Sequence, residues 1–324
     1  MAPYKDTFYT SSQETQRRND LDTGFYMWHE PYPYTHAVVS SMTGGPILIG
    51  DGVNGSNRTL IMRTCTARGL LLKPDRPATP TDRFWLTTLN NEDAAACRGD
   101  FSVTHTSLKL GTTTLTWLYA LGVQLCSPYS LTYEEWLGAS EPFLSSPRRT
   151  MQDGEDASKI LAAKPQAVPS VAFRPDDPAG TLVELQASQK AGNSIEIAAG
   201  PDYGTADFWR TAPVLPNGWA LLGELDKFIG VSRQRITNLT MVTASAGSSI
   251  KIRLEGTAGE VVHLSAARHE NATRNSDPLS VADKAAKGSW ALCTTEVVIG
   301  SDGSAESVLP PTGSYGDCKT WNDR

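Results

Sequence analysis

Long apolar runs, an excess of basic residues and an apolar leader are all missing from this 324-residue sequence. No apolar stretch reaches the roughly 18 residues that a membrane-spanning helix needs, so the sequence predicts no membrane span. Lys and Arg number 29 against 35 Asp and Glu, a net charge of −6, whereas a nucleic-acid footprint is normally basic and clustered. The stretch from Met1 to Asp20 lacks the apolar core of a signal peptide. We therefore expect no nucleic-acid partner and no secretion signal in the sequence as it stands.

Several common catalytic and cofactor motifs are missing as well. The five cysteines form no Cys-x-x-Cys pair, and the five histidines show no metal-ligand spacing. Glycine-rich phosphate loops of the Walker or dinucleotide type do not occur. Ser40-Ser41 and Ser145-Ser146 are not set in the Gly-x-Ser-x-Gly turn of a serine hydrolase. We therefore expect no metal site and no cofactor.

What the sequence does contain is typical of a globular protein with much β-structure. Hydrophobic residues make up 40% and charged residues 20% of the chain, which are ordinary proportions. The length suits two domains, or one large domain with an appendage. After about residue 80, segments rich in Thr, Val, Leu and aromatics alternate with Gly, Pro and Ser, which indicates strands and turns. These segments are Asp82–Leu89, Ser102–Leu110, Thr113–Leu125, Tyr129–Tyr133, Gly218–Leu225 and Trp290–Ile299.

The clearest strand is Ile250–Glu255, in which apolar residues alternate with charged ones. Such alternation is typical of an antiparallel strand with one buried face. The turn from Gly256 to Gly259 then leads into Glu260–Ala266, so the sequence predicts a β-hairpin here. Between Gly138 and Ser170 the composition shifts to Pro, Ser, Ala, Asp and Lys without periodicity, which indicates a surface loop or linker.

The segment Pro33–Thr66 has a different character, because it predicts a helix, a buried strand, an exposed loop and a second helix. Thr35–Met42 has apolar residues on one helical face and stops at a pair of glycines. Pro46–Ile49 is wholly apolar, as in a parallel strand covered on both faces. Asn57–Arg68 predicts the second helix. Asp51 stands just past the strand, where α/β barrels carry substrate-facing carboxylates, although Asp is also a common turn residue.

The N-terminal segment resembles the last part of the catalytic barrel in α-galactosidase-clan glycoside hydrolases, and within that clan the raffinose synthase-like branch. Asp20 and Asp22 precede an aromatic, Met-containing stretch, and the predicted helix leads into Gly44–Asp51, which is similar to the end of the family's eighth barrel strand. Arg68–Asp82 resembles the family's exit from the barrel into a β-domain. The likeness covers Asp6–Asp82, is weak in the remainder, and rests on the order of these motifs.

The resemblance implies a mixed fold: a remnant of the last α/β units of a (β/α)8 barrel followed by an antiparallel β-sandwich-like region. Eight strands and eight helices typically take about 250 residues, so the segment covers only the end of such a barrel. The implied divisions are 1–79 for the barrel segment, 80–137 for a β-rich region, 138–170 for a linker or surface loop, 171–309 for a C-terminal β-domain and 310–324 for a tail.

The resemblance also implies a carbohydrate ligand and an incomplete active site. Glycoside hydrolysis needs two carboxylates that flank the glycosidic bond, and the family's nucleophile lies on an earlier barrel strand. An N-terminal barrel portion outside this chain is therefore implied, and the chain is expected not to catalyse turnover by itself. Asp6 is the candidate acid/base, without the family's preceding Arg and Ser. Asp20, Asp22, Trp28 and Asp51 are the candidate substrate-binding residues.

A second function class stays open, which is a non-catalytic, β-rich secreted glycoprotein or carbohydrate-binding module. Four Asn-x-Ser/Thr sequons favour a secretory precursor; they begin at Asn54, Asn57, Asn238 and Asn271. A secreted or lumenal location follows if the full-length precursor carries a signal peptide. The aromatic residues before the predicted strand, Trp28 among them, suit either stacking on a sugar or packing in the core.

Overall fold

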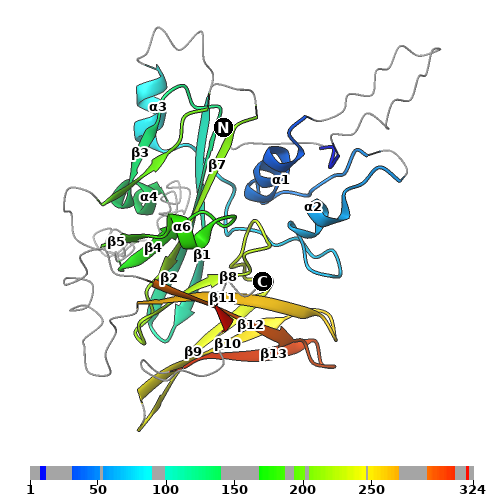
Figure 1. The fold of residues 1–324 in the computed structure, drawn as a ribbon, viewed down its shortest axis with the longest axis vertical. Coiled ribbons are helices and arrows are strands. Elements are labelled where there is room, and N and C mark those ends of the chain that lie inside the picture. Colours follow the sequence, from blue (N-terminus) through cyan, green and yellow to red (C-terminus); the bar gives the residue numbers. More distant parts are fainter. Residues whose placement is uncertain are drawn as a thin grey trace, which may run out of the picture.

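A computed structural model describes residues 8–11, 31–51, 54–89, 99–139, 168–186, 193–200, 204–245, 247–269, 290–310 and 319–320. The described part is mostly strand and contains an eight-stranded sheet, a four-stranded sheet and a two-stranded ribbon (Figure 1). The prediction that the chain is β-rich after about residue 80 is confirmed. None of the helices described is long and apolar enough to cross a membrane.

The eight-stranded sheet runs in the order β13-β10-β9-β1-β2-β7-β4-β5. Its strands are β1 (Asp100–Leu110), β2 (Thr113–Val123), β4 (Ser170–Phe173), β5 (Val183–Leu185), β7 (Ala206–Pro213), β9 (Ile236–Ala244), β10 (Gly247–Glu255) and β13 (Ser304–Leu309). Neighbouring strands are antiparallel, except that β1 and β9 are parallel and share the single pair Leu110 and Leu239. The sheet therefore consists of two antiparallel halves with a narrow join.

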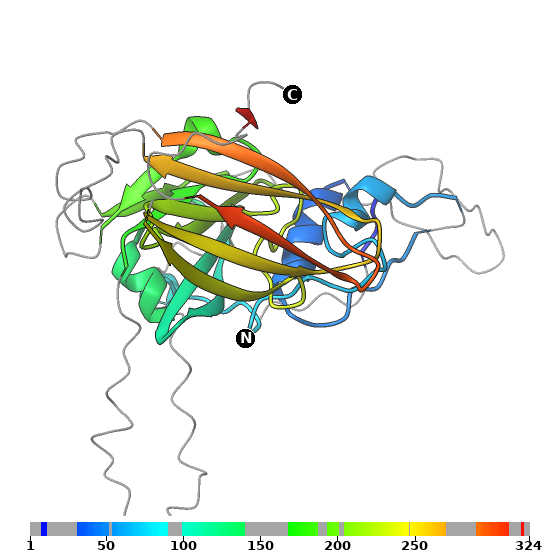
Figure 2. The ribbon, with the colours of Figure 1, turned by 90° about the horizontal axis from the view of Figure 1, so that it is seen from below.

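The four-stranded sheet is antiparallel and runs in the order β14-β12-β11-β8. Its strands are β8 (Trp219–Gly223), β11 (Val261–His269), β12 (Trp290–Val298) and β14 (Lys319–Thr320). Leu264 and Ala266 of this sheet belong to the same buried cluster as Ile250 and Ile252 of β10. Figure 2 shows the strands of this region running in similar directions. Two sheets that share one core in this way form a β-sandwich-like arrangement.

The other half of the large sheet has a second core. Trp136 of α4 (Tyr133–Ala139) packs there with Phe101 and Leu118 of the sheet, and Phe84 of α3 (Asp82–Leu89) is half-buried against them. The two-stranded ribbon, β3 (Tyr129–Thr132) with β6 (Ser194–Ile197), adds Leu131 to this core. A short helix, α6 (Pro178–Thr181), follows β4.

The N-terminal segment contributes α1 (Pro33–Met42) and α2 (Arg58–Met62). The predicted first helix is confirmed, and it buries Ala37, Val38 and Met42 in the shared core. The predicted second helix starts at the expected cap, because the Asn57 side chain accepts a hydrogen bond from the backbone N–H of Leu60. It ends early, since the chain turns at Thr64 into a bridge between Cys65 and Leu71.

The prediction that Pro46–Ile49 is a buried strand is wrong. Leu48 is 54% exposed and Ile49 38% exposed. Within the described residues the segment makes one parallel bridge, between Ile49 and Phe8. A strand of this kind is buried when a sheet continues beside it and helices cover both faces. With a single bridged neighbour, the apolar side chains stay open to solvent.

Two further predictions need correction. Asp82–Leu89 is not a strand but the helix α3, because the Thr81 hydroxyl accepts from the backbone N–H of Phe84 and caps a first turn that carries Asp82.

The hairpin from Ile250–Glu255 to Glu260–Ala266 is also absent: β10 and β11 lie in different sheets. The turn between them is a corner that takes the chain from one sheet to the other. Residues 140–167 of the predicted linker and most of the tail lie outside the described residues.

The end of β8 depends on a glycine. Gly223 has φ +80°, and a Cβ atom there would lie 2.2 Å from the backbone oxygen of Gly230. That same oxygen accepts a hydrogen bond of 2.9 Å from the N–H of Glu224. The backbone at Gly230 therefore lies directly against Gly223 and Glu224. This contact closes the first part of the loop of residues 224–235, which follows β8.

We predict that Gly223→Ala destabilises the fold more than the control Gly111→Ala. Gly111 has φ +61° with no atom within 4 Å of a built Cβ, so its replacement adds only backbone strain, about 1–2 kcal/mol. The alanine at position 223 adds a clash with a backbone oxygen that is already hydrogen-bonded. Urea unfolding of both variants measures the difference, and equal losses would show that the loop adapts freely.

Candidate functional site

Of the predicted carbohydrate-site residues, the structure describes Asp51. Its side chain joins the segment around Thr10 to its own segment, and the two segments run parallel. Its two carboxylate oxygens accept hydrogen bonds from the backbone N–H of Thr10 at 2.8 Å and from the Thr10 hydroxyl at 2.5 Å. The Thr10 hydroxyl also accepts from the N–H of Asn57 at 2.6 Å. Phe8, two residues before Thr10, bonds to Leu48 and Gly50 on either side of Ile49. Asp51 therefore lies just past the carboxyl ends of two parallel segments and holds them together.

Of the other sequence-predicted site residues, the structure describes three sequon asparagines and none of the remaining carbohydrate-site candidates. Asp6, Asp20, Asp22, Trp28 and Asn271 lie outside the described residues. The sequon residues Asn54, Asn57 and Asn238 are exposed. No group of three or more His, Cys, Asp or Glu side chains that could hold a metal ion occurs within the ranges described.

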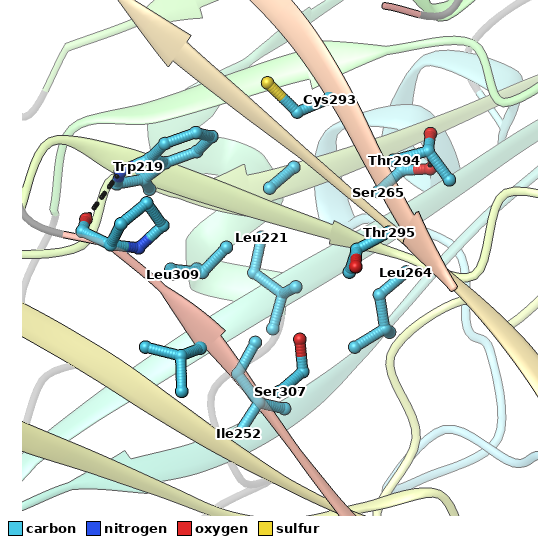
Figure 3. Close-up of a pocket in the computed structure, with 13 residues that line it drawn as sticks. Trp219, Leu221, Ile252, Leu264, Ser265, Cys293, Thr294, Thr295, Ser307 and Leu309 are labelled. Atoms are coloured by element: carbon cyan, nitrogen blue, oxygen red, sulfur yellow. Dashed lines mark hydrogen bonds between the residues drawn. The ribbon is translucent and has the colours of Figure 1, made fainter. Parts of the chain in front are cut away.

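An apolar cavity of about 310 Å³ lies between the two sheets of the sandwich. Figure 3 shows Leu221, Ile252 and Leu264 around this space, and the indole N–H of Trp219 donating to the backbone oxygen of Pro310 at 3.0 Å. Two of the lining hydroxyls, Ser265 and Thr294, bond to each other at 2.9 Å. Since these polar groups are already paired, they give a ligand little to orient against, and the cavity suits packing better than recognition.

A polar cavity of about 260 Å³ lies where four separate parts of the chain meet. Arg63 follows α2, Asp176 lies between β4 and α6, Asp226 follows β8, and His263 and Ser265 lie on β11. Cationic, anionic and neutral hydrogen-bonding groups thus converge on one small space. Such a combination of acidic, basic and hydroxyl-bearing side chains around a small space is typical of ligand-binding sites.

Arg63 and Asp176 form the fixed wall of this polar cavity. The guanidinium Nη2 of Arg63 donates to Asp176 at 2.8 Å, and the Tyr34 hydroxyl donates to the other Asp176 oxygen at 2.5 Å. Burial acts to raise the pKa of Asp176, but the hydrogen bonds from Tyr34 and Arg63 outweigh it and hold that pKa below its usual value. Asp176 is therefore charged at neutral pH.

A second charged cluster lies under the loop of residues 224–235. Arg235 is 1% exposed and donates from Nε to Glu224 at 3.0 Å and from Nη2 to Glu260 at 2.5 Å. Asp226 and the buried Lys227 lie close enough to act on Glu224 as well, with opposite signs. Burial, only partly offset by Arg235, raises the pKa of Glu224 to about 7.

Sequence reasoning did not find the residues of the polar cavity or of the Arg235 cluster. Arg63, Asp176, Asp226 and His263 come from four segments, and none belongs to a local motif. A weak signal existed in the charged run Glu224 to Lys227, which follows the apolar strand β8 directly. Charges placed straight after a buried strand often face a site.

Comparison with known proteins adds no assignment, because no protein-family model and no curated protein matches the sequence.

We predict that Glu224→Gln flattens the pH dependence of stability above about pH 5. The folded pKa of Glu224 is raised to about 7 from 4.5, so its stabilising contribution is complete below the unfolded pKa and is lost as pH rises through about 7. Burial acts to raise the pKa of Glu260 too, but the hydrogen bond from Arg235 outweighs it and lowers that pKa. The contribution of Glu260 therefore falls only in more acidic solution.

Urea unfolding at several pH values tests this prediction. The wild-type free energy of unfolding should decrease by up to a few kcal/mol between about pH 5 and about pH 8, and the Glu224→Gln profile should be nearly level. Glu306→Gln is the control, because its side chain is 56% exposed in a surface ion pair and contributes little. A wild-type profile that rises over this range would contradict the assignment.

Proposed function

We propose that this protein is the C-terminal portion of a carbohydrate-active protein resembling α-galactosidase and raffinose synthase-type enzymes, and that this chain is not catalytic by itself. One observation carries the proposal: Phe8 and Ile49 pair in parallel, α1 lies between them in sequence, and Asp51 follows the second segment. Parallel segments need a crossover connection, usually a helix. Two such segments and one helix are the unit from which a (β/α)8 barrel is built.

The exposure of the second segment supports the same proposal. Strands of a parallel barrel are covered on both faces, yet Leu48 is 54% exposed. Further barrel strands, supplied from outside these residues, would cover Leu48 and Ile49. The N-terminal segment is then a remnant of the last α/β units of a barrel, and the β-sandwich-like region is the domain that follows it.

The proposed lack of turnover follows from the carboxylates. Retaining glycosidases hold two carboxyl groups about 5–5.5 Å apart and inverting ones about 6.5–9.5 Å apart. Asp51 already uses both oxygens to hold Thr10. By the resemblance, the nucleophile that would lie opposite Asp51 or Asp6 belongs to a strand outside the chain. Positioning can supply roughly 7–11 kcal/mol of a reaction barrier, and a chain without the opposing carboxylate lacks that positioning.

We predict that the purified chain hydrolyses a chromogenic α-galactoside no faster than buffer. Transcript sequencing upstream of the Met1 codon should reveal in-frame strand–helix repeats with an aspartate at a strand end, and the longer product should turn over the α-galactoside. Asp51→Ala should lower that activity, whereas Asp100→Ala, at an exposed aspartate at the start of β1, should not. Turnover by the 324-residue chain that Asp51→Asn abolishes would overturn the proposal.

A second candidate function is a non-catalytic secreted glycoprotein or carbohydrate-binding module. It is favoured by the cysteines, because Cys126 and Cys293 each take part in a disulfide, while Cys65 is a free, buried thiol. Disulfides persist mainly in oxidising compartments outside the cytosol. The exposed Asn54 and Asn238 would be accessible to modification there.

We predict that the chain made in a eukaryotic secretory host carries a glycan at Asn54 or Asn57, but not at both. The two acceptors are three residues apart, so one glycan hinders modification of the other. Mass spectrometry of wild type, Asn54→Gln and Asn57→Gln measures occupancy, and each variant should shift the glycan to the remaining asparagine. Two empty sites in the wild type would remove this support for a secretory location.

A further inference from the structure

We propose that the polar cavity formed by Arg63, Asp176, Asp226, His263 and Ser265 binds a single neutral pyranose ring. This site is built by the β-domain and by the residue after α2, and it contains none of the sequence-predicted site residues. It goes beyond the proposed function, because it needs neither a barrel nor turnover. Its ligand is recognised by hydrogen bonds to ring hydroxyls.

The side chains around the cavity match the chemistry of a hydroxyl-rich ligand. A sugar hydroxyl both donates and accepts. The carboxylates of Asp176 and Asp226 accept only, and the guanidinium of Arg63 donates only. Leu225 and Pro175 add apolar surface to the same cavity, which suits the C–H face of a pyranose.

The donor and acceptor wall is fixed before any ligand arrives. The guanidinium carbon of Arg63 lies 5.1 Å from the ring centre of Tyr34 and 4.7 Å from that of Phe228. These two rings meet edge to face at 5.3 Å. With Asp176 held by both Arg63 and Tyr34, the wall loses little conformational entropy on binding, which favours affinity.

The charge around the cavity favours a neutral ligand over an ion. Two carboxylates, Asp176 and Asp226, face one guanidinium, Arg63. Behind them, Arg210 is 1% exposed and acts electrostatically on Asp176 and Tyr34. Burial lowers the pKa of Arg210 to about 10, so it stays charged at neutral pH. Arg63 pairs with Asp176, and the ammonium of Lys227 lies 3.6 Å from an Asp226 carboxylate oxygen. The carboxylates at the cavity thus each have a cationic partner, so a neutral, hydroxyl-rich ligand fits better than an ion.

The size of the cavity limits the ligand to one ring. Pockets for small molecules typically measure roughly 300–1,000 Å³, and about 260 Å³ lies just below that range. An oligosaccharide would have to leave its remaining units in solvent. Asp226, whose side chain is 60% exposed, marks the solvent side.

Chemical-shift mapping of the isotope-labelled chain with methyl α-galactopyranoside and methyl α-glucopyranoside tests the proposal. At least one pyranoside should shift the signals of Leu225, Asp226 and His263 with millimolar affinity. Asp226→Asn should weaken binding about tenfold or more, since it removes a charged hydrogen-bond acceptor whose side chain is 60% exposed, while Lys227 keeps its hydrogen bond to the backbone oxygen of Met62. The exposed Asp100→Asn carries the same chemical change on β1 and should leave affinity unchanged.

Several outcomes would overturn the proposal. They are no shift at the cavity with either pyranoside, equal affinity in Asp226→Asn, or binding there of galacturonate or glucosamine but of neither neutral sugar. Shifts confined to Thr10 and Asp51 would refute the cavity as a sugar site while supporting the barrel resemblance. Shifts at the cavity together with a failed turnover test of the longer product would leave the cavity site standing alone.

Discussion

The buried guanidinium of Arg235 is the contact on which the arrangement of the β-domain depends. It donates to Glu224 after β8, to the backbone oxygen of Glu255 at the end of β10, and to Glu260 in the corner before β11. Glu260 in turn accepts from the backbone N–H of Ala67 in the N-terminal segment. Burying charges is costly unless every partner is satisfied. Here one side chain ties both sheets and the N-terminal segment together, so the loss of Arg235 would leave two buried carboxylates without their shared cation.

The same network positions the polar cavity. The loop that starts at Glu224 is also bonded to the N-terminal segment: the N–H of Phe228 donates to the backbone oxygen of Arg63 at 2.9 Å, and Lys227 donates to Met62 at 2.7 Å. These contacts place Phe228 under the Arg63 guanidinium and turn Asp226 outward. Most side chains of residues 224–235 are also buried, Phe228 and Val231 among them. Packing and these hydrogen bonds together fix one wall of the cavity.

The fold shows which local signals determine structure and which do not. The alternation in β10 was predictable, because a half-buried strand needs a period of two. The corner after β10 was not predictable from the sequence. A glycine-containing turn between two strands has the same local sequence whether the strands pair or lie in different sheets. Here Glu260 in the turn accepts a hydrogen bond from Arg235, which is distant in sequence. In α3 a cap at Thr81 outweighs β-favouring residues. Asp51 could be found from its place after an apolar run, whereas the polar cavity could not, because its residues are distant in sequence.

One part of the N-terminal segment is buried against the β-domain, and another part is exposed to solvent. Val38 and Met42 place the inner face of α1 in the shared core, and Tyr34 packs edge to face on Phe228. The buried face of α1 therefore packs in the core that it shares with the β-domain, and Figure 1 shows the place of α1 in the fold. The parallel pair Phe8 and Ile49 is only partly buried, since Phe8 is buried while Ile49 and its neighbour Leu48 are exposed. The N-terminal segment is thus anchored to the sandwich through α1, while the apolar side chains of Leu48 and Ile49 stay open to solvent.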